Sequence, residues 1–124
     1  MSGTTLTITH LSGPCDGEMT EVQAIGSPPE VTLGRQTSCT IPLPYDSEVS
    51  RRHGRLLWRD QSWWLEDLKS SNGTFIGEFQ NQQRVTTAIR IEEGAVFRVG
   101  TSRFRIAASK AAKVAQMQNV ETWR

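Results

Sequence analysis

The sequence predicts an all-β sandwich or barrel, and three observations carry this prediction. Roughly ten short runs rich in β-branched, aromatic or alternating apolar residues follow one another along the chain. Clusters of Gly, Pro, Ser, Asn and Asp separate these runs. No apolar repeat with a helical period appears before Ala107. Many short strands divided by turn residues are typical of a sandwich or barrel.

The first half of the chain alternates short extended runs with breaks. Threonines alternate with apolar residues at 5–9, and Gly-Pro-rich clusters at 12–17 and 26–29 interrupt the chain on either side of the next run. Pro42 and Pro44 keep the fourth run out of a central strand, because proline donates no ladder hydrogen bond. The strands expected here are 5–9, 20–25, 30–33 and a brief extended piece at 41–43.

The second half begins with a hairpin, in which 59–61 connects strands at 55–58 and 62–66. In its second arm, Trp63 and Leu65 fall on one face, and Trp64 falls on the other. We interpret these tryptophans as sheet-face packing rather than as a platform for nucleic-acid bases. Gly94 and Gly100 interrupt the last part of the β region. Further short strands are expected at 74–76, 84–85, 88–91, 95–99 and 103–107.

The end of the chain has a different composition. Residues 109–123 are rich in Ala, Lys and Gln and contain no Gly or Pro, and Ser109 is a suitable helix N-cap. Their apolar stripe is weak, so the expected helix is short and marginal. We therefore divide the chain into a β domain over 1–107 and a tail over 108–124, which either packs on the domain or links it to a further region.

The 124 residues suffice for one domain with a real core, and the net charge is +1. A value so close to neutral argues against a nucleic-acid binder that relies on phosphate neutralisation along a backbone. Neither a membrane span nor a signal peptide is expected, which predicts a cytoplasmic location. Cys15 and Cys39 do not have the spacing of metal ligands. Two free thiols are favoured, and a disulfide between them stays an alternative.

The most concentrated chemistry in the chain is Ser50-Arg51-Arg52-His53, where a hydroxyl precedes two guanidiniums and an imidazole. Guanidinium forks and hydroxyls are suited to hold a phosphate group. Two other loops carry unusual residues: Gly34-Arg35 at the end of a strand, and the run 70–74, whose Asn-Gly pair predicts a tight turn with positive φ. Loops at one end of a sandwich cluster in space, so the three are expected to converge.

In this order and spacing, Gly34-Arg35, Ser50-x-x-His53 and Asn72-Gly73-Thr74 closely resemble the motifs of the forkhead-associated (FHA) domain. The resemblance covers residues 6–107. It implies a β-sandwich of about eleven strands, with a phosphothreonine-peptide site on its end loops. It implies no catalysis and no cofactor or metal. The implied partner is a phosphothreonine-containing protein, either a Ser/Thr kinase or a kinase substrate.

The resemblance also assigns roles to single residues. The expected phosphate contacts are Arg35, Ser50, Arg51 and Ser71. Asn72 is expected to hold the peptide main chain. The residues expected to shape the loops are Gly34, His53 and Gly73. Arg52 is expected to face solvent or pair with a carboxylate. The family's loop before the serine often contacts the third residue after the phosphothreonine, so we expect Glu48 to disfavour acidic residues there.

Two other functional classes compete with this interpretation. A hydrolase that uses Ser50 and His53 is disfavoured, since the chain has no Gly-x-Ser-x-Gly elbow and arginines beside a hydroxyl suit binding an oxyanion better than attack on a carbonyl. A Walker loop and a metal-ligand cluster are also missing from the sequence. The closer alternative is a domain of the same fold that binds partners, or itself, without phosphate.

Overall fold

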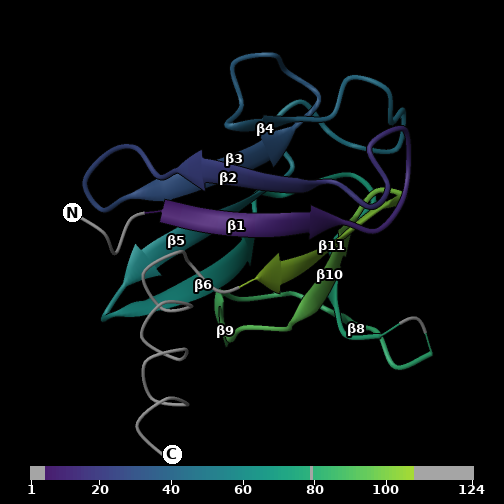
Figure 1. Ribbon diagram of the computed structural model, residues 1–124. Helices are drawn as coiled ribbons and strands as arrows, with labels where there is room; N and C mark the ends of the chain where they lie inside the picture. The colour runs from purple at the N-terminus through teal and green to yellow at the C-terminus, as the bar shows by residue number, and fades with distance from the viewer. Residues whose placement is uncertain (1–4, 79, 108–124) are drawn as a thin grey trace, which may run out of the picture.

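The computed structural model describes residues 5–78 and 80–107, which form eleven strands in two packed sheets (Figure 1). The all-β prediction is confirmed, and each expected strand lies within two residues of its predicted bounds. The helix expected in the tail 108–124 lies outside the described residues. No helix long and apolar enough to cross a membrane is found in the described part of the chain.

The first sheet has six strands, and its order along the sheet departs from the order along the chain. The first and last strands of the chain, Thr5–His10 and Ser102–Ala107, are direct neighbours in this sheet, with Thr7 opposite Ala107. In spatial order, the strands are β2 (Met19–Gln23), β1 (Thr5–His10), β11 (Ser102–Ala107), β10 (Val96–Val99), β7 (Thr74–Ile76) and β8 (Gln83–Arg84).

The second sheet has five strands. In spatial order, they are β4 (Ile41–Pro42), β3 (Glu30–Gly34), β5 (Gly54–Arg59), β6 (Ser62–Asp67) and β9 (Ile89–Ile91). The predicted hairpin is β5–β6, and its two turn residues, Asp60 and Gln61, both have positive φ, as a right-twisted hairpin favours. The proline-containing β4 lies at the sheet edge, where a missing donor is tolerated.

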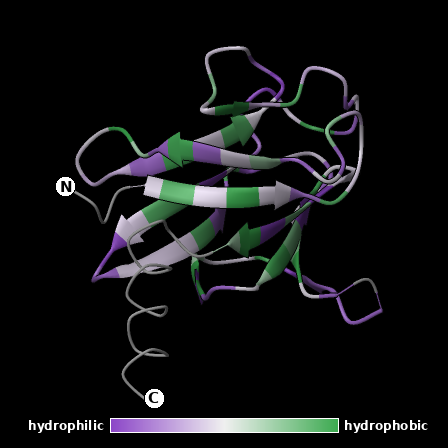
Figure 2. Cartoon of the chain, viewed as in Figure 1, coloured by the Kyte–Doolittle hydropathy of each residue, from purple (hydrophilic) through white to green (hydrophobic). Residues whose placement is uncertain are grey.

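The core lies between the sheets and follows from the alternation along each strand, which Figure 2 shows as changing hydropathy. In β1 the buried residues alternate with half-buried threonines. Phe97 and Phe104 are direct cross-strand partners and stack with ring centroids 5.3 Å apart. The large side chains that are fully buried include Leu6, Ile8, Leu33, Leu43, Leu56, Leu65, Phe97 and Phe104.

The pairing registers place several loops at the same end of the sandwich. In the five-stranded sheet, Gly54 lies opposite both Leu33 and Asp67, so the end of β3, the start of β5 and the end of β6 coincide. In the six-stranded sheet, Val99 lies opposite both Thr74 and Ser102, so β7 and β11 start where β10 ends. This end, at the upper right of Figure 1, carries all three predicted loops.

Candidate functional site

Gly34 ends β3 where two loop backbones touch. A Cβ on this residue would collide with the carbonyl oxygen of Arg51, so the contact requires glycine. Next to it, the backbone N–H of Arg35 donates to the carbonyl oxygen of Ser50 at 3.0 Å. Loop 35–40, after β3, is thereby tied to loop 43–53, which leads into β5. The side chain of Arg35 is exposed and makes no hydrogen bond or ion pair with any residue that the structure describes.

His53 is fully buried and joins two of the three loops through its ring. The backbone N–H of Ser50 donates to Nδ1 at 3.0 Å, and Nε2–H donates to the carbonyl oxygen of Gly73 at 2.7 Å. Because Nδ1 accepts a hydrogen bond, the ring is neutral and carries its proton on Nε2. An imidazole engaged at both nitrogens is a structural link rather than an acid or base.

Ser50 presents its hydroxyl at the junction between loops. Its Oγ accepts the backbone N–H of Ser71 at 3.1 Å. Because that bond uses an oxygen lone pair, the hydroxyl hydrogen is left to donate to an anion. Ser71 itself is exposed beside it. The structure therefore places the two predicted phosphate-binding serines in direct contact.

Asn72 makes a bond within the protein that sequence reasoning missed. Its Nδ2–H donates to the carbonyl oxygen of Glu48 at 2.8 Å. The side-chain carbonyl oxygen of Asn72 makes no hydrogen bond with a described residue and is left to accept from a peptide N–H. Gly73 follows with a φ of 88°, as the Asn-Gly pair predicts. Asn72 thus holds loop 43–53 in place and keeps one polar atom for a ligand.

Asp67, at the end of β6, supports the third loop, 68–73. Its carboxylate accepts the backbone N–H and the hydroxyl of Ser70 and the hydroxyl of Thr74. The Ser70 hydroxyl in turn accepts the N–H of Gly73 at 2.9 Å. Burial raises the pKa of the Asp67 carboxyl, but these hydrogen bonds outweigh it and bring the pKa below its ordinary value. The signal in the sequence was an Asp three residues before a Ser, which is typical of local side-chain capping.

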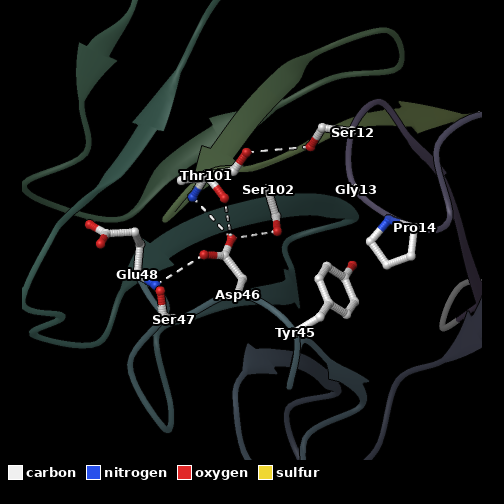
Figure 3. A pocket seen from close by; sticks show the side chains of 9 residues that line it. All are labelled: Ser12, Gly13, Pro14, Tyr45, Asp46, Ser47, Glu48, Thr101 and Ser102. Carbon is white, nitrogen blue, oxygen red and sulfur yellow. Dashed lines mark hydrogen bonds between the residues drawn. The ribbon is translucent and has the colours of Figure 1, made fainter.

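Asp46 has a similar role between loop 43–53 and the β10–β11 turn (Figure 3). The carboxylate accepts the N–H and hydroxyl of Thr101, the hydroxyl of Ser102 and the N–H of Glu48. Burial raises the pKa of the Asp46 carboxyl, and the hydrogen bonds again bring it below its ordinary value. Sequence reasoning missed this residue, because its hydroxyl partners lie 55 and 56 positions away.

The side chain of Asp46 lies in a pocket of about 400 Å³, shown in Figure 3. Ser12, Gly13 and Pro14 line one side, and Tyr45 lies against them with its ring half-exposed. Glu48 lines the pocket too, and its carbonyl oxygen is the atom bound by Asn72. Loop 43–53 therefore lines the pocket and also contacts Asn72 of the third loop.

Three arginine side chains at this end have no carboxylate partner among the described residues. Arg51 and Arg52 are both exposed, and neither makes a hydrogen bond or ion pair through its side chain with a described residue. With Arg35, they give three guanidiniums in two touching loops. No group of His, Cys, Asp or Glu with metal-binding geometry occurs in the described ranges. Fixed hydroxyls beside free guanidiniums suit a compact anion with several oxygens.

Comparisons with known proteins identify a family model, a curated relative and solved structures that this chain is similar to. The family model described as "FHA domain" matches residues 31–100. The protein FhaB of Mycobacterium tuberculosis (strain H37Rv) is 34% identical over 73% of this chain. The match covers 56% of FhaB, so the chain spans about half the length of this curated relative.

Two solved structures share the fold and more than a quarter of their aligned residues with this chain. A domain from a structural and functional analysis of phosphothreonine-dependent FHA domain interactions superposes with a TM-score of 0.65 at 28% identity, covering 85% of this chain and 97% of that one. The FhaA FHA domain, solved in complex with the intracellular domain of Rv3910, gives 0.64 at 27% identity, covering 82% and 98%.

Proposed function

The chain belongs to the forkhead-associated (FHA) family, and we propose that it is a non-catalytic module that binds phosphothreonine in a partner protein. The family consists of binding modules rather than catalysts. The observation that carries the proposal is the exposed end where Ser50 contacts Ser71 and the side chain of Arg35 has no described partner. A phosphorylated side chain brings about −1.5 to −2 charges and three acceptor oxygens, which these groups can satisfy.

Each phosphate contact follows from the donor that a side chain has left. The Ser50 hydroxyl donates one hydrogen bond, because its oxygen already accepts the N–H of Ser71. The Ser71 hydroxyl supplies a second. Arg35 supplies charge-assisted bonds, and Arg51 adds another cation from the neighbouring loop. We propose no phosphate contact for Arg52, whose exposed side chain faces solvent.

The remaining residues orient the peptide. The side-chain carbonyl oxygen of Asn72 accepts a peptide N–H, which sets the direction of the main chain. Glu48 places a carboxylate beside the path of the peptide, on the rim of the pocket that also contains Tyr45. A carboxylate there repels acidic side chains, so we propose that it disfavours them at the third residue after the phosphothreonine. Gly34, His53 and Gly73 keep the loops in register.

The partner we propose is a Ser/Thr kinase or one of its substrates, because these enzymes create phosphothreonine. The FhaA domain solved with the intracellular domain of another protein supports a protein partner. We assign binding to residues 1–107 and treat 108–124 as a connecting segment. We also propose a cytoplasmic setting, where Cys15 and Cys39, both free thiols, would stay reduced.

The test is binding of a degenerate phosphothreonine peptide library to the wild type and to Arg35→Ala, with phosphoserine and unphosphorylated pools as controls. We expect the wild type to bind only the phosphothreonine pool. Arg35→Ala should weaken binding by about 10–150-fold, which corresponds to a charge-assisted bond of roughly 1.5–3 kcal/mol. Arg90→Ala, an exposed arginine on β9, is the matched control.

Two outcomes would contradict parts of the proposal. If the wild type binds a partner equally well without phosphate, the phosphate-independent or self-association alternative replaces it. If the selected peptides are enriched in acidic residues at the third position after the phosphothreonine, the role of Glu48 is wrong.

A further inference from the structure

The outer face of the six-stranded sheet carries three arginines in one row across neighbouring strands. Phe75 lies opposite Arg84 on one side and opposite Arg98 on the other, and Arg98 lies opposite Arg103. Directly opposed residues of antiparallel strands point to the same face. Across the strands the order is therefore Arg84, Phe75, Arg98 and Arg103. We call the three arginines the arginine row.

Arg98, in the middle of the row, is held by uncharged groups. Arg98 lies 4.3 Å from the centroid of the Phe75 ring and donates to Oε1 of Gln82 at 3.2 Å and to the carbonyl oxygen of Gly100 at 2.6 Å. Arg84 is exposed and makes no hydrogen bond or ion pair with the residues described. The positive charge of these two side chains is therefore not neutralised by a neighbouring carboxylate.

Placing arginines opposite each other has a cost, because like charges directly across a strand pair destabilise the sheet. Arg98 and Arg103 are such a pair. Together with Gln82 and Thr101 they line a hollow of about 390 Å³. The two guanidiniums give the hollow a positive charge, which attracts carboxylate or phosphate oxygens, whereas the Thr101 hydroxyl already donates to Asp46.

The row is continuous with loop 68–73 and with the pocket beside Glu48. The Arg84 guanidinium packs against Gly73, where a Cβ would lie 3.1 Å from Nε and 3.2 Å from Cζ. Gly73 directly follows Asn72, the residue proposed to hold the peptide main chain. At the other end, Thr101 lines both the hollow of the arginine row and the pocket that contains Glu48. A chain that leaves the loops can therefore pass onto this face without a gap.

We propose that the arginine row binds a second anionic group of the same phosphorylated partner, outside the residues next to the phosphothreonine. This inference rests on the proposed function, since it takes the occupant to be a continuation of the bound peptide. The ligand chemistry is a carboxylate cluster or a second phosphate. The face is not broadly basic, because it also carries Glu21 and the Arg105–Glu78 ion pair, at 3.8 Å. A local row of three cations fits a short acidic segment better than a nucleic acid or a membrane surface.

The test compares phosphothreonine peptides that share one neutral core and differ in their flanks. One peptide has neutral flanks, two carry a short run of Glu before or after the core, and two carry a single phosphoserine at the same places. Each is titrated against the wild type and against Arg84→Gln/Arg103→Gln by fluorescence anisotropy at low salt. Arg98 is left in place because it holds the carbonyl of Gly100. The control is Arg59→Gln/Arg90→Gln, which removes the same charge from the five-stranded sheet.

We expect an anionic flank on one side of the core to tighten wild-type binding by about fivefold, as two exposed ion pairs would provide. The row variant should lose this increase and bind the neutral peptide as the wild type does, and the control should keep the increase. If the Glu flank tightens binding more than the phosphoserine flank, the ligand of the row is a carboxylate cluster, and if the phosphoserine flank does so, it is a second phosphate. Thermal unfolding of each variant checks that it is folded.

Four results would overturn the inference. No increase with any anionic flank means that the row has no such ligand, while binding of the neutral peptide leaves the proposed function intact. An increase that survives in the row variant places the contact elsewhere. Row-dependent binding of a DNA duplex or of anionic vesicles, without an effect of the flanks, assigns the row to another partner. Failure of the neutral peptide itself to bind the wild type refutes the proposed function and this inference with it.

Discussion

His53 connects Ser50 and Gly73 through ring nitrogens with opposite roles, one accepting and one donating. Its backbone adds two further links, since its N–H donates to Leu33 and its carbonyl oxygen accepts from Leu68. A single buried residue therefore holds β3 and two loops at fixed separations, the loops through its ring and β3 through its backbone. The proposed phosphate donors on these loops are therefore preorganised, which lowers the entropy lost on binding.

Replacing His53 by Phe should remove both ring bonds while keeping most of the buried volume. The Ser50 N–H and the Gly73 carbonyl would lose their partners, at about 1–3 kcal/mol each. We therefore expect urea unfolding to show a free energy of unfolding lower by about 2–6 kcal/mol, with weaker phosphopeptide binding. The matched control is His10→Phe, which removes a bond to the Thr20 hydroxyl. Unchanged stability and affinity in His53→Phe would contradict this role.

At the scale of elements, two carboxylates hold the loops to the sheets. Asp67 organises loop 68–73, and Asp46 joins loop 43–53 to the β10–β11 turn. The hydrogen bonds outweigh burial and lower the pKa of both carboxyls below 3.8, the ordinary value. A group whose folded pKa is lower than its unfolded pKa stabilises the fold above the unfolded value, and this stabilisation disappears as pH falls through the folded pKa.

We therefore expect the free energy of unfolding to decrease as pH falls below about 4, because both carboxylates must be protonated. Urea titrations at a series of pH values would measure this dependence. Asp67→Asn should be less stable at neutral pH but should show a shallower decrease in acid, because its amide does not titrate. An identical acid slope in wild type and Asp67→Asn would show that Asp67 does not contribute to it.

The sequence predicted the elements well, because each strand carries its own alternation and each turn its own Gly, Pro or Asn. It also predicted the convergence of the three loops, which follows from sandwich topology. It did not predict Asp46, since the partners Thr101 and Ser102 are distant in the chain. The bond from Asn72 to Glu48 and the arginine row were missed for the same reason. Both depend on strand register and loop packing, which local patterns do not specify.

For the whole molecule, the distribution of charge matters more than its sum. The net charge is +1, yet Arg35, Arg51 and Arg52 lie together in two loops at one end. Exposed charges of this kind act over about 8–10 Å at physiological ionic strength. We therefore expect the molecule to attract a phosphate to one end while remaining nearly neutral overall.

Salt should consequently weaken phosphopeptide binding. Between about 0.05 and 0.5 M NaCl, we expect the affinity of the wild type for a phosphothreonine peptide to fall severalfold, because the contacting cations are exposed and screened. Arg35→Ala should show a shallower dependence, and Arg90→Ala should match the wild type. Isothermal titration calorimetry at several salt concentrations measures both slopes. Affinity that does not change with salt would show that charge contributes little to recognition.

The pairing of β1 with β11 has a consequence for how the fold can be carried by a larger chain. Thr7 lies opposite Ala107, so the polypeptide enters and leaves the sandwich at neighbouring points. These points lie at the end opposite the three loops, on the left of Figure 1. A domain with this geometry can be inserted into a surface loop of a host protein: the host's backbone would be left nearly uninterrupted, and the proposed phosphate-binding end would face outward.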